Sequence, residues 1–213
     1  MTESLEALGR EVAALADAGA PLAVSCLVAA YFIGTISPAI LLGRMKGVDI
    51  REKGSGNAGT TNVLRTLGRK AAAITLAIDV LKGSAAVLLA GLAGGGALSV
   101  FCGFAALCGH IWPAPYGFRG GKGVATGLGV ILAFDPAIGL ISLGIALAVI
   151  ALTRRVSAGA LTAVTIFPAL MHAAQPAYTL PAIAIAALLW IKHRHNVARI
   201  IRGQEPKLSF GRK

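Results

Sequence analysis

The sequence predicts an all-α polytopic membrane protein with seven transmembrane helices, its N-terminus outside and its C-terminus in the cytoplasm. Hydrophobic residues make up 56% of the 213 residues and charged residues only 14%. The mean hydropathy is +0.75, which is too apolar for an ordinary soluble domain of this length. The prediction also rests on apolar runs of membrane length and on where the basic residues fall.

The apolar runs divide the chain into predicted spans. Residues 22–43 and 71–93 are each long enough to cross a hydrocarbon core of about 30 Å at about 1.5 Å per residue. Shorter apolar runs follow. The predicted spans are 22–43, 71–93, 97–112, 122–134, 137–153, 157–173 and 178–192. We assign residues 22–213 to one membrane domain and residues 1–21 to an extension on the external side.

The stretch 122–153 has two interpretations. It forms either one long helix kinked at Pro136 or two short helices. One helix would place Arg154 and Arg155 outside and would separate the basic C-terminal tail from the other basic loops. Two helices keep every basic segment on one side, so we predict two.

The basic residues give the orientation. The net charge is +11, and 18 of the 20 lysines and arginines fall in the segments 44–70, 119–122, 154–155 and 192–213. The turns 94–96, 135–136 and 172–176 contain none. This distribution follows the positive-inside rule, so the basic face is predicted to be cytoplasmic. No aromatic-studded or groove-fitting element accompanies the charges, which argues against a nucleic-acid partner.

The N-terminus and the cysteines have simpler interpretations. The first twenty residues are acidic, which is not typical of a cleavable signal peptide. Apolar residues there recur at helical spacing and predict a short amphipathic helix: Leu5, Leu8, Val12 and Leu15. The three cysteines lie in apolar runs without metal-ligand spacing, so they are expected to be packing residues: Cys26, Cys102 and Cys108.

The first polar island is the segment GSGNAGTTNVLR at residues 54–65. It matches the dinucleotide pattern GxGxxG, but no buried strand precedes it and a membrane helix follows, so that reading fails. What remains is a glycine-rich loop with hydroxyls, amides and the guanidinium of Arg65, which are groups that hold phosphate. The alternative is a glycine-rich turn that caps the next helix.

The second island, at residues 109–127, contains the turn Gly120-Gly121-Lys122-Gly123 before an apolar helix. It is not a Walker A loop, because Gly123 stands where a magnesium-binding Ser or Thr is needed. Backbone N–H groups, a helix dipole and the Lys122 charge still suit an anion. The alternative is a basic anchor at the membrane surface.

The third island, KHRHNVARIIRGQEPKL at residues 192–208, is predicted to place His193, Asn196 and Ile200 on one helical face. Nearby cations should lower the pKa of His193, which suits a neutral base. The alternative is a helix that binds lipid headgroups.

Together and in order, the three islands resemble the PlsY family of acyl-phosphate:glycerol-3-phosphate acyltransferases, from about residue 31 to residue 208. The chain departs from the family motifs at Thr60, where alanine is usual, and in the sequence of residues 116–119. The resemblance implies a multi-pass protein of the bacterial inner membrane with a cytoplasm-facing site. It implies transfer of a fatty acyl group from acyl phosphate to glycerol 3-phosphate, giving lysophosphatidic acid and phosphate in the first step of phospholipid synthesis. It implies no cofactor, metal, nucleotide or acyl-CoA, and an upstream enzyme that makes the acyl phosphate.

The resemblance also implies residue roles. The catalytic candidates are Ser55, Arg65, Lys122, His193 and Asn196. The substrate-binding candidates are Asn57, Thr61, Asn62, Arg69, Gly120, Gly121, Gly123 and Ser157. Glu205 is expected to be structural. Asp79 and Lys82 lie three residues apart in a predicted span, where unpaired charges are costly, so we expect them to pair or face the site.

The mechanism and the competing functions follow from these residues. Cations would hold two phosphates together, Ser55 and Asn196 would donate hydrogen bonds to substrate oxygens, and either His193 or a substrate phosphate would take the hydroxyl proton. The soluble-type acyltransferases need His-x-x-x-x-Asp, which is absent from the chain. The main alternative is a transporter of an organic phosphate, but beyond Asp79 and Lys82 the spans lack the midplane ionisable groups that it would need. A purely structural lipid-binding protein would leave the Ser, Asn and His positions unexplained.

Overall fold

The computed structural model describes residues 5–6, 8–10, 12–13 and 19–208, and this part of the chain is helical without strands. The α-helices are α2 (Ala20–Thr35), α3 (Pro38–Met45), α4 (Thr60–Thr66), α5 (Arg69–Ile111), α6 (Val124–Phe134), α7 (Pro136–Thr153), α8 (Val156–Ala174), α9 (Thr179–Lys192) and α10 (Arg194–Ile201). Two 3₁₀ turns, η1 (Ala114–Tyr116) and η2 (Pro176–Tyr178), precede α6 and α9. The all-helical class is therefore as predicted.

Within the described residues, four segments are long and apolar enough to cross a membrane: Ala20–Met45, Arg69–Tyr116, Pro136–Thr153 and Val156–Ala174. Val124–Phe134 and Pro176–Lys192 are apolar but shorter. The predicted spans thus correspond to apolar helices. Such helices keep the backbone hydrogen bonds inside the segment, as a lipid environment requires.

The first predicted span is a broken helix. α2 ends at Thr35 and α3 begins at Pro38, because proline has no N–H to continue the backbone bonding. The break exposes the carbonyl oxygen of Ile36, which accepts a 2.6 Å hydrogen bond from Nζ of Lys82 on α5. The interruption at residues 36–37 thereby becomes an attachment point for a buried cation.

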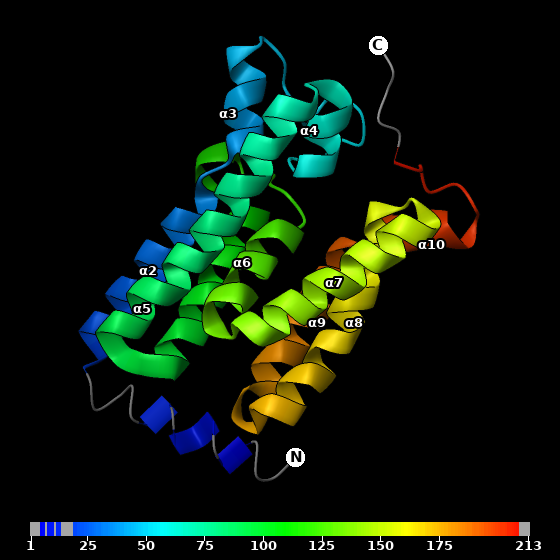
Figure 1. The fold of residues 1–213 in the computed structure, drawn as a ribbon. Helices are drawn as coiled ribbons and strands as arrows, with labels where there is room; N and C mark the ends of the chain where they lie inside the picture. The colour runs from blue at the N-terminus through cyan, green and yellow to red at the C-terminus, as the bar shows by residue number, and fades with distance from the viewer. Residues whose placement is uncertain (1–4, 7, 11, 14–18, 209–213) are drawn as a thin grey trace.

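Helix α5 reverses direction near its middle. Gly94 and Gly95 have non-helical backbone angles, and the φ of Gly95 is +79°, which favours glycine. The Ser99 hydroxyl donates to the carbonyl oxygen of Val87, so the two halves lie against each other. Figure 1 shows the reversal at the end of the molecule opposite α3 and α4. The two halves correspond to the predicted spans 71–93 and 97–112.

The stretch 122–153 forms two helices, as predicted. Asp135 separates α6 from α7, and its side chain accepts a 3.0 Å hydrogen bond from the Ile138 N–H. Pro136 occupies the first position of α7, where its missing N–H has no cost. Gln175 donates to the other Asp135 oxygen at 2.8 Å and joins this junction to the end of α8.

Small residues allow close packing of α2, α5 and α6. A Cβ added at Gly34 would overlap the Ala106 carbonyl oxygen, and one at Gly129 would overlap that of Val80. Figure 1 shows these helices on one side of the molecule and α7, α8 and α9 on the other, with α3, α4 and α10 toward one end. The two helix groups meet around a buried apolar cluster that includes Leu107, Ile131, Phe167, Ile185 and Leu189.

The remaining predictions concern the N-terminus and the cysteines. The described residues 5–6, 8–10 and 12–13 are helical, while Leu15 of the predicted amphipathic helix lies outside the described residues. Cys102 is buried and Cys26 and Cys108 are partly buried, and all three are free thiols, which agrees with a packing role.

Candidate active site

A cavity of about 400 Å³ lies between the helices and is polar at one end and apolar at the other. Its polar end brings together residues from all three sequence islands. The predicted site residues that line it are Ser55, Asn57, Thr61, Asn62, Arg65, Lys122, Gly123, Ser157, His193 and Asn196. Its apolar end is lined by α6, α7, α8 and α9 through side chains such as Leu128, Leu147, Val164 and Phe167.

Asn62 holds the first loop in shape. Its Oδ1 accepts the Ser55 N–H at 2.9 Å, and its Nδ2 donates to the carbonyl oxygens of Ile50 and Lys53 at 3.0 Å each. The side chain is buried, and its amide is engaged by the loop rather than left open toward a ligand. Gly54 has φ +59°, and a Cβ there would overlap Asn62 Oδ1, so the loop requires glycine at this position. This fold of the loop leaves the Ser55 hydroxyl at the cavity.

Thr60, at the start of α4, was expected only as one of the hydroxyls of the phosphate-holding loop and was not among the substrate-binding candidates. Thr60 lines the cavity, and its buried hydroxyl has no hydrogen-bond partner within the described residues. A buried hydroxyl without a partner is costly, so a substrate oxygen would relieve this cost. The only sequence signal was a hydroxyl in the polar island.

Gly120 and Gly121 differ from their predicted role. Their N–H groups donate to the carbonyl oxygens of Ile111 and His110 at the end of α5, so they are not open to an anion. A Cβ at Gly121 would overlap the His110 ring. These glycines therefore allow the turn to pack against α5, and of the three predicted glycines only Gly123 lines the cavity. Arg69, at the start of α5, also does not line it.

Lys122 and Asn196 connect the second and third islands. Nζ of Lys122 donates a hydrogen bond to Oδ1 of Asn196. Burial, together with the nearby Arg199 guanidinium, lowers the pKa of Lys122 to about 8, so the ammonium is still charged at neutral pH. Arg65 also lies close enough to influence it. The polar end of the cavity is therefore cationic.

His193 lies at the junction between α9 and α10. Its Nδ1 is 2.8 Å from the Leu189 carbonyl oxygen, which can only accept, so Nδ1 carries the proton and Nε2 is the basic nitrogen. Burial lowers the pKa of His193 to about 4. The direction agrees with the sequence-based expectation, but burial is the larger cause and the Lys122 charge a smaller one. His193 is a neutral imidazole at neutral pH.

Glu205 in the C-terminal tail organises the third island. Its Oε1 accepts hydrogen bonds from Ser157 and Asn196, each at 2.6 Å, and its Oε2 accepts from Arg199 at 2.7 Å. Burial raises the pKa of Glu205, but these three hydrogen bonds outweigh it and lower the pKa below its ordinary value. The Ser157 hydroxyl and one N–H of Asn196 thus donate within the protein, and the second N–H of the Asn196 amide is left for the predicted donation to a substrate.

A buried ion pair lies behind the polar end of the cavity. Lys82 Nζ is 2.7 Å from Asp79 Oδ1 and 2.9 Å from His110 Nδ1, so Asp79 and Lys82 pair as predicted. Asp79 and His110 line the cavity. Sequence reasoning missed His110, although a histidine at the end of an apolar run is an unusual polar residue. Within the described residues, no group of three or more His, Cys, Asp or Glu could hold a metal ion.

A cationic, hydroxyl-rich pocket that continues into an apolar slot suits a substrate with a phosphate and a fatty chain. The family model described as glycerol-3-phosphate acyltransferase matches residues 24–203. The chain belongs to the glycerol-3-phosphate acyltransferase family.

Individual relatives of the acyltransferase agree with this assignment. The glycerol-3-phosphate acyltransferase of Thermoanaerobacter pseudethanolicus is 44% identical over 190 residues, covering 87% of this chain and 96% of its own. That of Rhizobium meliloti is 44% identical over 192 residues, covering 89% of this chain and 94% of its own. The acyltransferase assignment therefore holds over nearly the whole chain.

Solved structures agree as well. PlsY (YgiH), an integral membrane glycerol 3-phosphate acyltransferase, aligns in its glycerol 3-phosphate form with a TM-score of 0.84 and 36% identity. In its lysophosphatidic acid form it aligns with a TM-score of 0.82 and 35% identity. Both alignments cover 88% of this chain and 96% of the solved chain. The fold of this solved acyltransferase is thus shared over most of the chain.

Proposed function

We propose that this acyltransferase takes its fatty acyl group from acyl phosphate and transfers it to glycerol 3-phosphate, forming lysophosphatidic acid and inorganic phosphate. The observation that carries the proposal is a cavity whose cationic end continues into an apolar slot. The related PlsY has been solved with glycerol 3-phosphate and with lysophosphatidic acid, which supports the same acceptor and product here.

The cationic end would hold two phosphates. Two phosphate groups near each other repel, and this repulsion is stronger where water is excluded. Arg65 and Lys122 both line the cavity and offset the negative charge. Ser55 and Thr60 add hydroxyl donors at the same end. The acyl chain would extend from there into the apolar slot, where burying each methylene is favourable by about 0.8 kcal/mol.

The chemical step needs no covalent enzyme intermediate, because an acyl phosphate is already activated. The glycerol hydroxyl oxygen attacks the acyl carbonyl carbon and forms the new ester bond. The bond between the carbonyl carbon and the phosphate oxygen breaks, and phosphate leaves with that electron pair. The hydroxyl proton goes either to Nε2 of His193 or to a substrate phosphate, whose second pKa is about 6.

The orientation in the membrane belongs to the same proposal. Seven spans, with the N-terminus outside and the active site facing the cytoplasm of a bacterial inner membrane, would place soluble glycerol 3-phosphate at the cationic end. The clustering of lysines and arginines in three connecting segments and the C-terminal tail supports this arrangement. A fluorescent reporter fused to the C-terminus should fold and fluoresce, whereas an alkaline phosphatase fusion at the same position should be inactive.

The purified protein tests the donor directly. It is incubated with glycerol 3-phosphate and either palmitoyl phosphate or palmitoyl-CoA, and lysophosphatidic acid is detected by mass spectrometry. We expect product from acyl phosphate alone and loss of that product in the Arg65→Gln variant. Product from acyl-CoA instead would overturn the proposed donor, and no product from either would overturn the activity of this chain.

A further inference from the structure

We propose that Phe167, with Ile131 and Ile185, forms the floor of the acyl slot and limits the length of the fatty chain that the enzyme accepts. The inference rests on the proposed function, because it assigns the apolar end of the cavity to the acyl chain. The three floor residues would select among acyl donors by their length.

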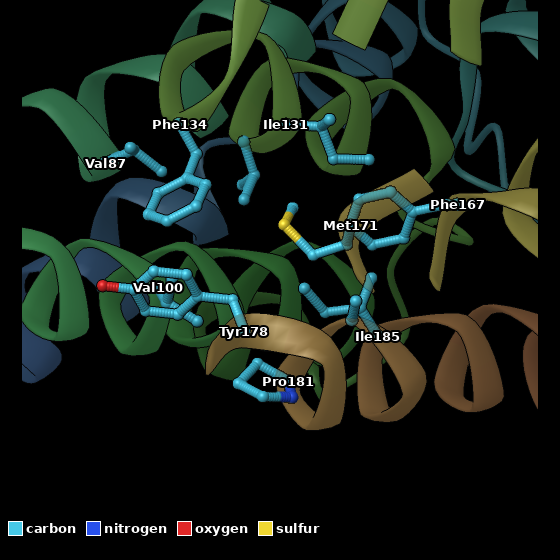
Figure 2. Close-up of a pocket in the computed structure, with 11 residues that line it drawn as sticks. Val87, Val100, Ile131, Phe134, Phe167, Met171, Tyr178, Pro181 and Ile185 are labelled. Atoms are coloured by element: carbon cyan, nitrogen blue, oxygen red, sulfur yellow. The ribbon is translucent and has the colours of Figure 1, made fainter. Parts of the chain in front are cut away.

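The floor is visible as the boundary between two cavities. A second void of about 20 Å³ is lined by apolar side chains, and it shares Ile131, Phe167 and Ile185 with the main cavity. Figure 2 shows these three residues together on one side of the void, with Val87 and Phe134 on the other. All three shared side chains are buried, with 3% to 8% of their surface exposed.

The order of residues along the helices supports this geometry. On α8, Ser157 and Ala163 line only the main cavity, Phe167 lines both, and Met171 lines only the second void. On α9, Leu189 lines only the main cavity, while Ala182, beyond Ile185, lines only the second void. The second void therefore continues the slot away from the polar end. Three side chains from α6, α8 and α9 separate the two spaces.

The helix rise gives the scale of the slot. The ten helical steps from Ser157 to Phe167 span about 15 Å, and the further turn to Met171 adds about 6 Å. With a C–C bond of about 1.5 Å, an extended chain advances about 1.3 Å per carbon, so that turn corresponds to about four methylenes. An apolar void takes up apolar groups readily, as engineered core cavities do. Opening the floor should therefore admit longer chains.

The test is the chain-length profile of floor variants. For wild type, Phe167→Ala and Phe167→Leu, kcat/KM is measured with saturated acyl phosphates from decanoyl to icosanoyl. Each newly buried methylene is worth a factor of about four, so Phe167→Ala should raise the ratio of long-chain to short-chain kcat/KM about tenfold or more and move the optimum by about four carbons. Phe167→Leu should produce a smaller shift in the same direction.

A filling variant makes the opposite prediction. Ala163 lies one turn nearer the polar end on the same face of α8, so Ala163→Leu should shorten the slot and favour shorter chains. Ile166→Ala, an outward-facing neighbour with 37% exposure, is the matched control and should keep the wild-type profile. Ratios within one variant do not depend on how much protein folds, and if Phe167→Ala fails to fold, Phe167→Leu and Ala163→Leu decide the question.

The outcomes separate the floor from the activity. Shifts in opposite directions support the floor. Unchanged profiles in the Phe167 and Ala163 variants would mean that the acyl tail leaves the cavity sideways into lipid, and this would overturn the proposal while leaving the proposed reaction intact. A wild-type protein that makes no lysophosphatidic acid from any chain length would instead overturn the proposed function itself.

Discussion

The Asn196 amide nitrogen donates a 2.6 Å hydrogen bond to Oε1 of Glu205, and this bond sets the orientation of the amide. A carboxylate only accepts, so Nδ2 must face Glu205 and Oδ1 must face Lys122. The C-terminal tail therefore positions the cation at the cavity through Asn196, although Glu205 is nine residues away along the chain.

Removing Glu205 tests this connection. Glu205→Ala leaves the buried donors of Ser157 and Asn196 without their acceptor and should lower the free energy of unfolding by about 2–4 kcal/mol. We expect a lower Tm in detergent and a lower kcat, with Glu205→Gln milder because it keeps an acceptor oxygen. Glu52→Ala, at an exposed loop position, is the control and should change neither. A Glu205→Ala protein with the wild-type Tm would contradict the role of the tail.

Titration of Lys122 should determine how kcat/KM changes with pH on the alkaline side. Because its pKa is about 8, the ammonium loses its proton as the pH rises through 8, and the cavity then loses a positive charge. The kcat/KM for glycerol 3-phosphate should fall over this range, where the substrate phosphate stays fully ionised. Lys122→Arg should remove this decline because arginine stays charged. Lys122→Ala should raise the KM for glycerol 3-phosphate, and an unchanged KM would remove Lys122 from this role.

Substitution of His193 tests which group takes the hydroxyl proton. With a pKa of about 4 it stays neutral down to pH 5, and Nε2 is free to accept. If His193 is the base, His193→Gln should lower kcat by about 10² or more with little change in the KM for glycerol 3-phosphate. Substantial activity with the same pH profile in His193→Gln would assign the proton to a substrate phosphate and leave His193 a positioning role.

Ser55 and Asn62 should give different kinetic effects. Ser55→Ala removes the hydroxyl but keeps the backbone bond from Ser55 N–H to Asn62, so kcat should fall by about 10² while the Tm stays unchanged. Asn62→Ala breaks all the hydrogen bonds that its amide makes in the loop, so both the Tm and the affinity for glycerol 3-phosphate should fall. Calorimetry and steady-state kinetics on the two variants separate the roles. The same loss of Tm in both would contradict this division.

Substitutions in the buried pair of Asp79 and Lys82 should have non-additive effects on Tm. Asp79→Asn leaves a buried ammonium without its counter-charge, which typically costs about 3–5 kcal/mol. The double variant Asp79→Asn with Lys82→Met removes both charges and should recover much of the lost Tm. Lys70→Met on the exposed start of α5 is the control. A double variant with a Tm below both single variants would show that the pair does not act as a unit.

Much of the candidate site could be predicted, because the types of residue and their order along the chain identify the three polar islands. Ser55, Arg65, Lys122, His193 and Asn196 come from islands far apart in sequence, yet each island stood out because polar residues are costly between apolar runs. The division between α6 and α7 also followed from local chemistry, since Asp135 and Pro136 form a helix start. Such signals need only neighbouring residues.

The tertiary structure decided how the polar groups are used. Asn62 was predicted to bind the substrate, but both N–H groups of its amide donate to the carbonyl oxygens of Ile50 and Lys53. Asn196 uses one of its two N–H groups to bind Glu205. Gly120 and Gly121 looked like an anion loop, but α5 lies against them and takes their N–H groups. His110 gained its place only because α5 folds back at Gly95 and brings it to Lys82.

The sequence by itself determined a helical membrane protein, the order of its helices and the family to which it belongs, because composition, periodicity and motif spacing are properties of the chain alone. Only the tertiary structure decided which residues face the cavity, which hydrogen bonds are already made and where the acyl slot ends at Phe167. These features depend on contacts between segments that are distant in sequence. Only those contacts decide which groups a side chain hydrogen-bonds and which space it fills.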